Sequence, residues 1–186
     1  SDSRHFEYDP LGRLARRGDA TFAYDNAGNL IEKREGGRRT LYRYDPESRL
    51  VEVRTSEHTV SYAYDAFGNL LRRVVDGKST EYFVDPLGAV PQVVAEFSDG
   101  APAGTFLMAP MRVAHRAADG KMSYLLEDHL GSTRCVADDA GKLIARYSYS
   151  PFGTPKLEEG RSQIGFLFAG ELWDREAELV YLRARF

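Results

Sequence analysis

The chain has 186 residues, with 25 Lys and Arg against 28 Asp and Glu, so its formal net charge is −3. This length suits one or two domains with a buried core, and the balanced charge provides no basic surface of the kind that binds nucleic acid. The apolar runs are too short to cross a bilayer, so we expect no membrane insertion. The single cysteine, Cys135, excludes an internal disulfide framework, and the four histidines lie too far apart for a metal site. We therefore expect no metal and no cofactor.

The first residues, Ser1-Asp2-Ser3-Arg4-His5, contain neither an initiator Met nor the apolar centre of a signal peptide. We therefore expect the chain to be an excised or processed piece of a longer protein. Tyr (11) and Phe (10) are abundant and Gly reaches 17, a composition that favours strands joined by turns over helices.

A seven-residue motif, Tyr-Asp-x-x-Gly-x-Leu, recurs through the first half of the chain. Its copies start at residues 8, 24, 44, 64 and, in a worn form, 84, so that one interval is 16 residues and three are 20. The repeated positions are Tyr8, Asp9, Gly12, Leu14, Tyr24, Asp25, Gly28, Leu30, Tyr44, Asp45, Leu50, Tyr64, Asp65, Gly68, Leu70, Asp85 and Gly88.

Each motif position has a physical interpretation as part of a turn. The Asp carboxylate can accept hydrogen bonds from backbone N–H groups one to three residues further on, and the Gly supplies a conformation that is costly for residues with a Cβ. The Leu begins the next apolar strand. Ser48 replaces the Gly in the third copy, so we expect that turn to be distorted or to hold a side chain under strain.

A second set of turns lies between the motifs, at Gly18-Asp19, Gly36-Gly37, Ser56-Glu57 and Asp76-Gly77. Gly-Gly and Asp-Gly favour two-residue hairpins, whose type I′ turn needs positive φ at both central residues. Val60, Tyr62 and Tyr64 alternate with smaller side chains, which indicates one packed strand face. We predict that residues 8–90 form consecutive antiparallel hairpins, with two turns per 20 residues.

The turn spacing continues after residue 90 while the motif fades. Breaks at Asp99-Gly100, Asp119-Gly120, His129-Leu130-Gly131, Ala140-Gly141 and Pro151-Phe152-Gly153 predict strands such as 123–126 and 143–149. Residues 171–185 have a weak helical periodicity and predict the single helix. The positions that we single out here are Asp128, His129, Gly131, Pro151, Phe152, Gly153, Gly170, Asp174, Tyr181 and Arg183.

The seven-residue motif, at its 20-residue spacing, resembles the YD repeat of the Rhs family. The ordered motifs of the second half resemble the Rhs repeat-associated core segment. The resemblance implies YD repeats over residues 1–97 and a core segment over residues 98–186, continuous with the repeats. It implies a mainly β fold in which antiparallel hairpins form a curved, spiralling sheet. In bacterial members this sheet closes into a hollow shell around a C-terminal toxin domain, and secretion systems or toxin complexes deliver the assembly.

The chain departs from the family pattern at its end, because it stops at Arg185-Phe186, before the aspartates with which many members cut themselves. Five repeats are also too few to enclose a cavity. We therefore expect a non-enzymatic structural shell segment of bacterial origin, secreted or delivered. Its expected partners are the remainder of the shell, an encapsulated toxin domain and the proteins of the delivery apparatus.

Two other functions remain open from the sequence. The repeats could form an extracellular module that binds carbohydrate or protein, or the chain could be a truncated self-cleaving aspartyl protease core. For the second, Asp174, Glu176 and Glu178 are the candidate acids, although we expect them to be solvated residues of a turn and helix start. Asp128-His129 is poorly placed for a catalytic dyad, and Cys135 is expected to be a small buried hydrophobe.

Overall fold

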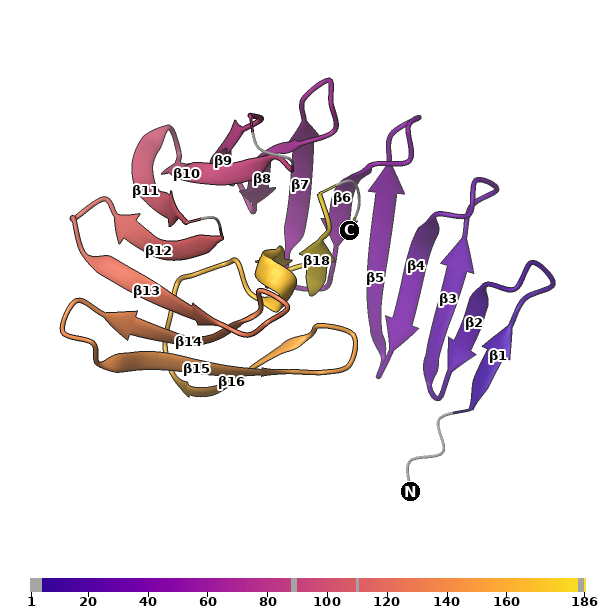
Figure 1. The fold of residues 1–186 in the computed structure, drawn as a ribbon. Helices are drawn as coiled ribbons and strands as arrows, with labels where there is room; N and C mark the ends of the chain where they lie inside the picture. Colours follow the sequence, from indigo (N-terminus) through magenta and orange to yellow (C-terminus); the bar gives the residue numbers. More distant parts are fainter. Residues whose placement is uncertain (1–4, 88–89, 110, 184–185) are drawn as a thin grey trace.

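The computed structural model describes residues 5–87, 90–109, 111–183 and 186. Sixteen strands form one antiparallel sheet in which every strand pairs with its neighbours in the sequence, and a separate two-stranded hairpin follows (Figure 1). The first half of the sheet comprises β1 Phe6–Tyr8, β2 Leu14–Arg17, β3 Ala20–Tyr24, β4 Leu30–Glu35, β5 Arg38–Tyr44, β6 Leu50–Arg54, β7 Thr59–Tyr64 and β8 Leu70–Val75. The second half comprises β9 Lys78–Asp85, β10 Gln92–Ser98, β11 Ala101–Met108, β12 Arg112–Ala117, β13 Met122–Glu127, β14 Thr133–Asp138, β15 Leu143–Tyr149 and β16 Pro155–Gly160. The hairpin consists of β17 Leu172–Asp174 and β18 Leu179–Tyr181, after the short 3-10 helix η1 Phe168–Gly170.

This arrangement confirms the predicted mainly β fold of consecutive hairpins, and the expected strands at 123–126 and 143–149 lie within β13 and β15. The expected boundary between residues 97 and 98 falls inside β10, and the sheet continues across it. The division into repeats and core segment therefore stays a proposal about the sequence.

The YD motifs form the turns after odd-numbered strands, which we call the long turns. At Asp65, one carboxylate oxygen accepts the backbone N–H groups of Phe67 and Asn69, both at 2.8 Å, and the other accepts the Asn69 side chain. Asp9 and Asp45 bind the residues two and four positions further on in the same way. The carboxylate thus reaches one residue further than the sequence suggested.

The turn glycines adopt the left-handed conformation that their lack of a Cβ permits. Gly28 has φ 91° and Gly68 has φ 85°, and Ser48 has φ 60°, which confirms that the third turn holds a side chain in this region. Gly88 lies outside the described residues. The Gly36-Gly37 and Asp76-Gly77 short turns match the type I′ expectation, since both residues of each pair have positive φ (57° and 77°, 49° and 90°).

The sheet bends because an irregularity recurs at one position of the repeat. The pairing register shifts immediately before Tyr24, Tyr44 and Tyr64, where a strand enters a long turn. Such bulges bend a strand and increase its twist. The sheet therefore curves around an inner face, whose buried residues include Val53, Val60 and Tyr62. This confirms the expected packed face of the aromatic strands.

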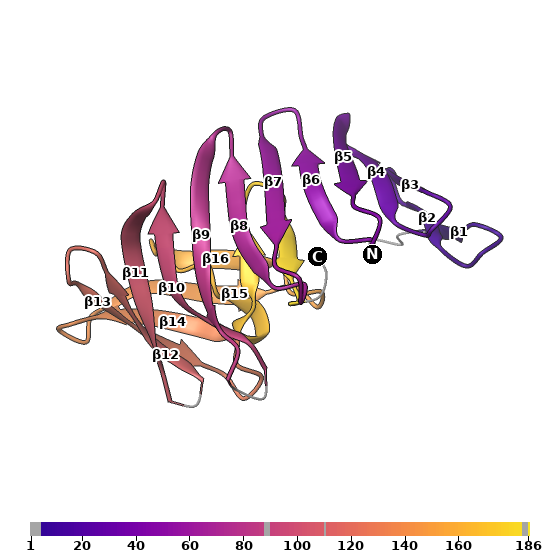
Figure 2. The same ribbon diagram turned by 90° about the horizontal axis from the view of Figure 1, so that it is seen from above.

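After β16 the chain leaves the sheet and runs inside its curve (Figures 1 and 2). Ile164, Phe166 and Leu167 are buried against the inner face. The expectation of a helix over residues 171–185 is wrong, because this stretch contains the β17–β18 hairpin and no helix among its described residues. Strand pairing buries Leu172 and Tyr181 together, which the weak helical periodicity did not reveal.

Candidate functional site

The strongest polar contact between distant parts of the chain is made by Asp174, at the end of β17. Its side chain is fully buried, and Arg73 of β8 donates to it from Nε (2.6 Å to Oδ2) and Nη2 (2.8 Å to Oδ1). The Tyr62 hydroxyl donates to Oδ2 at 2.7 Å. The backbone N–H groups of Glu176 and Ala177 donate to Oδ1 at 3.1 and 3.0 Å. A forked arginine–carboxylate pair of this kind is both strong and geometrically specific.

Arg73 also contacts the carboxylate of Glu176, so that two acids share one guanidinium. Burial alone would lower the pKa of Arg73, but the hydrogen bonds and negative charge of Asp174 raise that pKa above its usual value. Burial, reinforced by the charge of Asp174, also raises the pKa of Tyr62. Arg73 is therefore held as a cation and Tyr62 as a neutral donor, both pointed at Asp174.

This cluster corrects the expectation that Asp174 is a solvated turn residue. Sequence reasoning also missed its partners, because Arg73 and Tyr62 lie 101 and 112 positions away in the chain. Nothing in the Arg72-Arg73 pair distinguishes the buried arginine from its exposed neighbour, apart from the strand alternation that places successive side chains on opposite faces.

A second contact joins Tyr181 of β18 to the long turn between β7 and β8. The Tyr181 hydroxyl accepts the backbone N–H of Leu70 at 3.0 Å and lies 3.0 Å from the Gly68 carbonyl oxygen. Phe186 stacks nearby, with its ring centroid 4.4 Å from that of Tyr62 and 5.1 Å from that of Tyr181. A residue of the β17–β18 hairpin thus binds directly to a YD turn.

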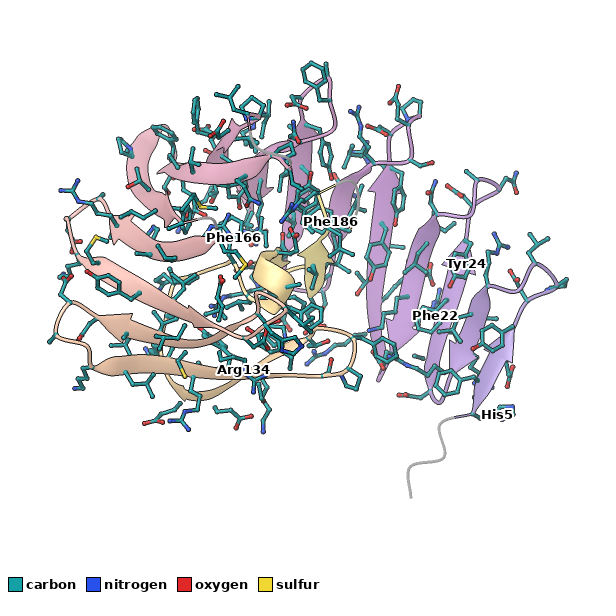
Figure 3. The ribbon with its side chains drawn as sticks, in the orientation of Figure 1. His5, Phe22, Tyr24, Arg134, Phe166 and Phe186 are labelled. Atoms are coloured by element: carbon teal, nitrogen blue, oxygen red, sulfur yellow. The ribbon has the colours of Figure 1, made fainter. Side chains whose placement is uncertain are left out.

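A third contact is made by Arg112 of β12, which is only 4% exposed. Its guanidinium donates to the carbonyl oxygens of Gly170 (3.1 Å) and Val93 (3.3 Å), and it lies 3.6 Å from the ring centroid of Phe166. Figure 3 shows Phe166 and Phe186 inside the curve of the sheet. Burial lowers the pKa of Arg112 to about 10, while the charge of Glu96 opposes this. No motif in the sequence marks this arginine.

Two turns of the second half of the chain, 128–132 and 150–154, lie against η1. Asp128 accepts the N–H groups of Leu130 and Ser132, at 3.0 Å each, and so repeats the YD turn chemistry. Gly153 has φ 82°, and a Cβ there would lie 2.6 Å from the Phe168 ring. Ser132 accepts the Ala169 N–H at 3.0 Å. The structure therefore brings these turns to the C-terminal segment.

The other residues singled out in the second half of the chain are exposed or bound elsewhere. His129 is an exposed turn residue, and within the described chain it makes no hydrogen bond to Asp128. Pro151 and Phe152 are exposed at a turn tip, and Arg183 pairs with Glu171 at 2.8 Å. Cys135 is half-buried on β14, rather than buried as we expected.

The YD residues hold neighbouring hairpins to one another. The Tyr64 hydroxyl donates to the Leu50 carbonyl at 2.6 Å, and Tyr24 makes the same bond to Leu14 at 2.9 Å. Arg49 links its own turn to the next one, since it donates to Asp45 and its guanidinium lies 5.5 Å from the Tyr64 ring centroid. Tyr8 of the first motif has different surroundings, because it is 63% exposed at the edge strand β1.

The short turns add a further connection that the sequence did not suggest. Asp99 accepts the Ser79 N–H at 2.8 Å, Asp76 accepts the Thr59 N–H at 2.9 Å, and Asp19 accepts the Gly36 N–H at 3.1 Å. Each of these bonds joins one hairpin to the next. Aspartates along both ends of the strands therefore bind backbone, which is a structural use of the carboxylate.

The contacts between the C-terminal segment and the sheet offer a chemistry of binding and positioning. In the described part of the chain, no group of three or more His, Cys, Asp or Glu is placed to hold a metal ion. Nor does any described helix have the length and apolar character needed to cross a membrane.

The inner face also has an open groove of about 490 Å³ between β2–β5 and residues 175–179, lined by Phe22, Tyr42, Arg38 and Arg175 among others.

Comparison with known proteins identifies what this sheet is similar to. A family model described as Teneurin YD-shell matches residues 1–186. The tRNA3(Ser)-specific nuclease WapA of Bacillus spizizenii is 26% identical over 185 residues, which are 96% of this chain. The chain spans only 6% of the length of that relative.

Two solved structures share the fold. The structure described as TcdB2-TccC3-Cdc42 matches 98% of this chain with a TM-score of 0.51 and 12% identity. The structure described as TcdB2-TccC3 matches 89% with a TM-score of 0.54 and 15% identity. This chain covers 15% and 12% of those chains, respectively.

Proposed function

The chain belongs to the Teneurin YD-shell family, and from this premise we propose that it forms part of the wall of a shell that encloses a toxin domain before delivery. Its role in a YD shell is structural. The proposed partners are the remainder of that wall, the enclosed toxin domain, and the proteins of a secretion system or toxin complex. The proposed setting is a bacterium that secretes or delivers the whole assembly.

The observation that carries this proposal is the direction in which the chain runs after its last sheet strand. Residues 161–183 turn back into the curve of the sheet, where Asp174 is bound by Arg73 and Tyr62 (Figure 2). Phe186 lies on this inner side, against Tyr62. Any residues that follow Phe186 in a longer protein would therefore start inside the wall.

The open groove on β2–β5 supports an inner surface that contacts an enclosed chain. The C-terminal segment contacts Tyr62 through Asp174 and Phe186, whereas the half-buried Phe22 lines the groove next to Arg38 and Arg175. A surface of mixed apolar and charged groups suits many short contacts with an enclosed polypeptide.

We propose, further, that the chain has no hydrolytic activity. Both carboxylate oxygens of Asp174 accept hydrogen bonds from the protein itself, so neither is available to activate a water molecule. The motif aspartates bind backbone in the same way at separate turns. This support favours a structural carboxylate over half of a catalytic pair.

Protection from proteolysis would test the shell function. The full-length protein that carries this chain would be treated with thermolysin, as wild type, as Asp174→Asn, and as the control Glu57→Gln in an exposed short turn. We expect the segment after Phe186 to resist digestion in the wild type and the control, and to be cut faster in Asp174→Asn. If this segment is cut as fast in the wild type as it is when produced alone, the chain does not enclose it.

A further inference from the structure

The two ends of the strands differ sharply in the side chains that they expose. Because consecutive strands are antiparallel, all long turns lie at one end of the sheet and all short turns at the other; the long turns of β1–β8 are at the upper end in Figure 1. The short turns carry acids, including Asp76, Asp99, Asp119 and Asp139. The long turns from β7 to β16 carry large apolar residues instead.

We call this second set the apolar rim. Its side chains are exposed by 42% to 91%, in the order Phe67 91%, Leu87 91%, Val90 42%, Met111 49%, Leu130 60% and Phe152 87%. They come from five successive long turns, so at least one exposed apolar side chain recurs at each of these turns along the sheet. Apolar patches of this extent on a protein surface usually mark an interaction site.

The charges at the rim are already satisfied within the turns. The sequences 65–69, 85–91, 109–111, 128–132 and 150–154 contain no Lys, Arg or Glu. Asp65 has both carboxylate oxygens engaged, and Asp128 accepts two backbone N–H groups. Asp85 accepts the Leu87 N–H at 2.9 Å. Little net charge therefore faces outward to oppose a second apolar surface or to attract a charged one.

We propose that the apolar rim is a self-association surface, which packs against the same rim of a second copy of this chain. Neighbouring long turns are two strands apart, which is about 10 Å. A partner can insert its apolar side chains between those of the rim if they recur at the same spacing and along the same curve. A second copy meets both conditions through an isologous two-fold contact.

The available area sets the expected strength of this contact. Six apolar side chains exposed to this degree offer roughly 600 Å² per copy, below the roughly 800 Å² per partner of a standard stable interface. The association is therefore weak, with a dissociation constant on the order of micromolar. This self-association does not depend on an enclosed chain, so its test is separate from the test of the shell function.

Sedimentation velocity of the 186-residue chain across the micromolar range tests the proposal. We expect a monomer–dimer equilibrium that the triple variant Phe67→Ser, Leu87→Ser, Phe152→Ser weakens at least about tenfold, without loss of the β circular dichroism spectrum. The matched control is Phe83→Ser, because Phe83 is 62% exposed but lies on a strand and not at a turn. If the triple variant does not fold, the single change Phe152→Arg replaces it and is expected to weaken the dimer through like-charge repulsion.

Several outcomes would overturn the proposal. A chain that stays monomeric throughout this range lacks the interface. A dimer that survives the rim variants forms elsewhere, for example through the open edge strands β1 and β16. Equal weakening by Phe83→Ser would show general stickiness and not a rim. Binding to phosphatidylcholine vesicles without self-association would assign the rim to a membrane instead.

Discussion

Replacing Asp174 by Asn tests whether the buried ion pair holds the C-terminal segment against the sheet. Asn keeps the size and hydrogen-bonding shape of the side chain but removes its charge, which leaves Arg73 largely buried with Glu176 as its remaining acid. Removing one partner of a buried pair costs about 3–5 kcal/mol, and the lower end applies here because Glu176 stays in place. We expect a loss of about 3 kcal/mol in the free energy of unfolding.

For a chain of this length, about 3 kcal/mol corresponds to a fall in Tm of roughly 6–12 °C, measurable by scanning calorimetry. The matched control is Asp119→Asn, which removes one partner of the exposed pair between Asp119 and Lys121. Solvent screens an exposed pair, which therefore contributes little to stability, so this variant should keep a Tm close to that of the wild type. If Asp174→Asn lowers the Tm no more than Asp119→Asn does, the buried pair does not hold the segment, and the reasoning is refuted.

Three further predictions concern other parts of the fold. Gly153→Ala should destabilise the protein more than Gly28→Ala in urea unfolding, because both residues have positive φ but only a Cβ at 153 meets the Phe168 ring; equal losses would contradict the docking of η1 on this turn. Burial raises the pKa of Glu96 to about 7, so the folded state binds a proton that the unfolded state releases, and stability should fall as pH rises from about 5 to about 7. The Glu96→Gln variant should lose that slope, and a wild-type curve that is flat over the same range would refute it. Purified chain held for days near pH 5 and near pH 7 should keep one intact mass, whereas a discrete cut abolished by Asp174→Asn would favour the self-cleaving core.

The repeat could be interpreted from the sequence because its contacts are local. Each structural feature of the repeat depends on residues within one 20-residue unit. The Asp binds a backbone group four residues further on, the Gly adopts positive φ, and the aromatic side chains alternate along a strand. The hairpins, their order and the buried face of Val60 and Tyr62 follow from these rules. The strained turn at Ser48 was also predictable, because the missing Gly places a side chain at the position of positive φ.

The contacts of Asp174 and Tyr181 with the sheet could not be predicted, because they join residues more than 100 positions apart in the chain. The bend that brings them together is the sum of small bulges at Tyr24, Tyr44 and Tyr64, and the repeat motif does not encode its total angle. The fate of Asp174 illustrates this limit. Its charge predicted a solvated residue, but the inner surface of the curved sheet presents Arg73 and Tyr62 to it, and their hydrogen bonds compensate for the loss of water. Local sequence thus determined the hairpins, and only the tertiary structure decided which charges are buried between them and the C-terminal segment.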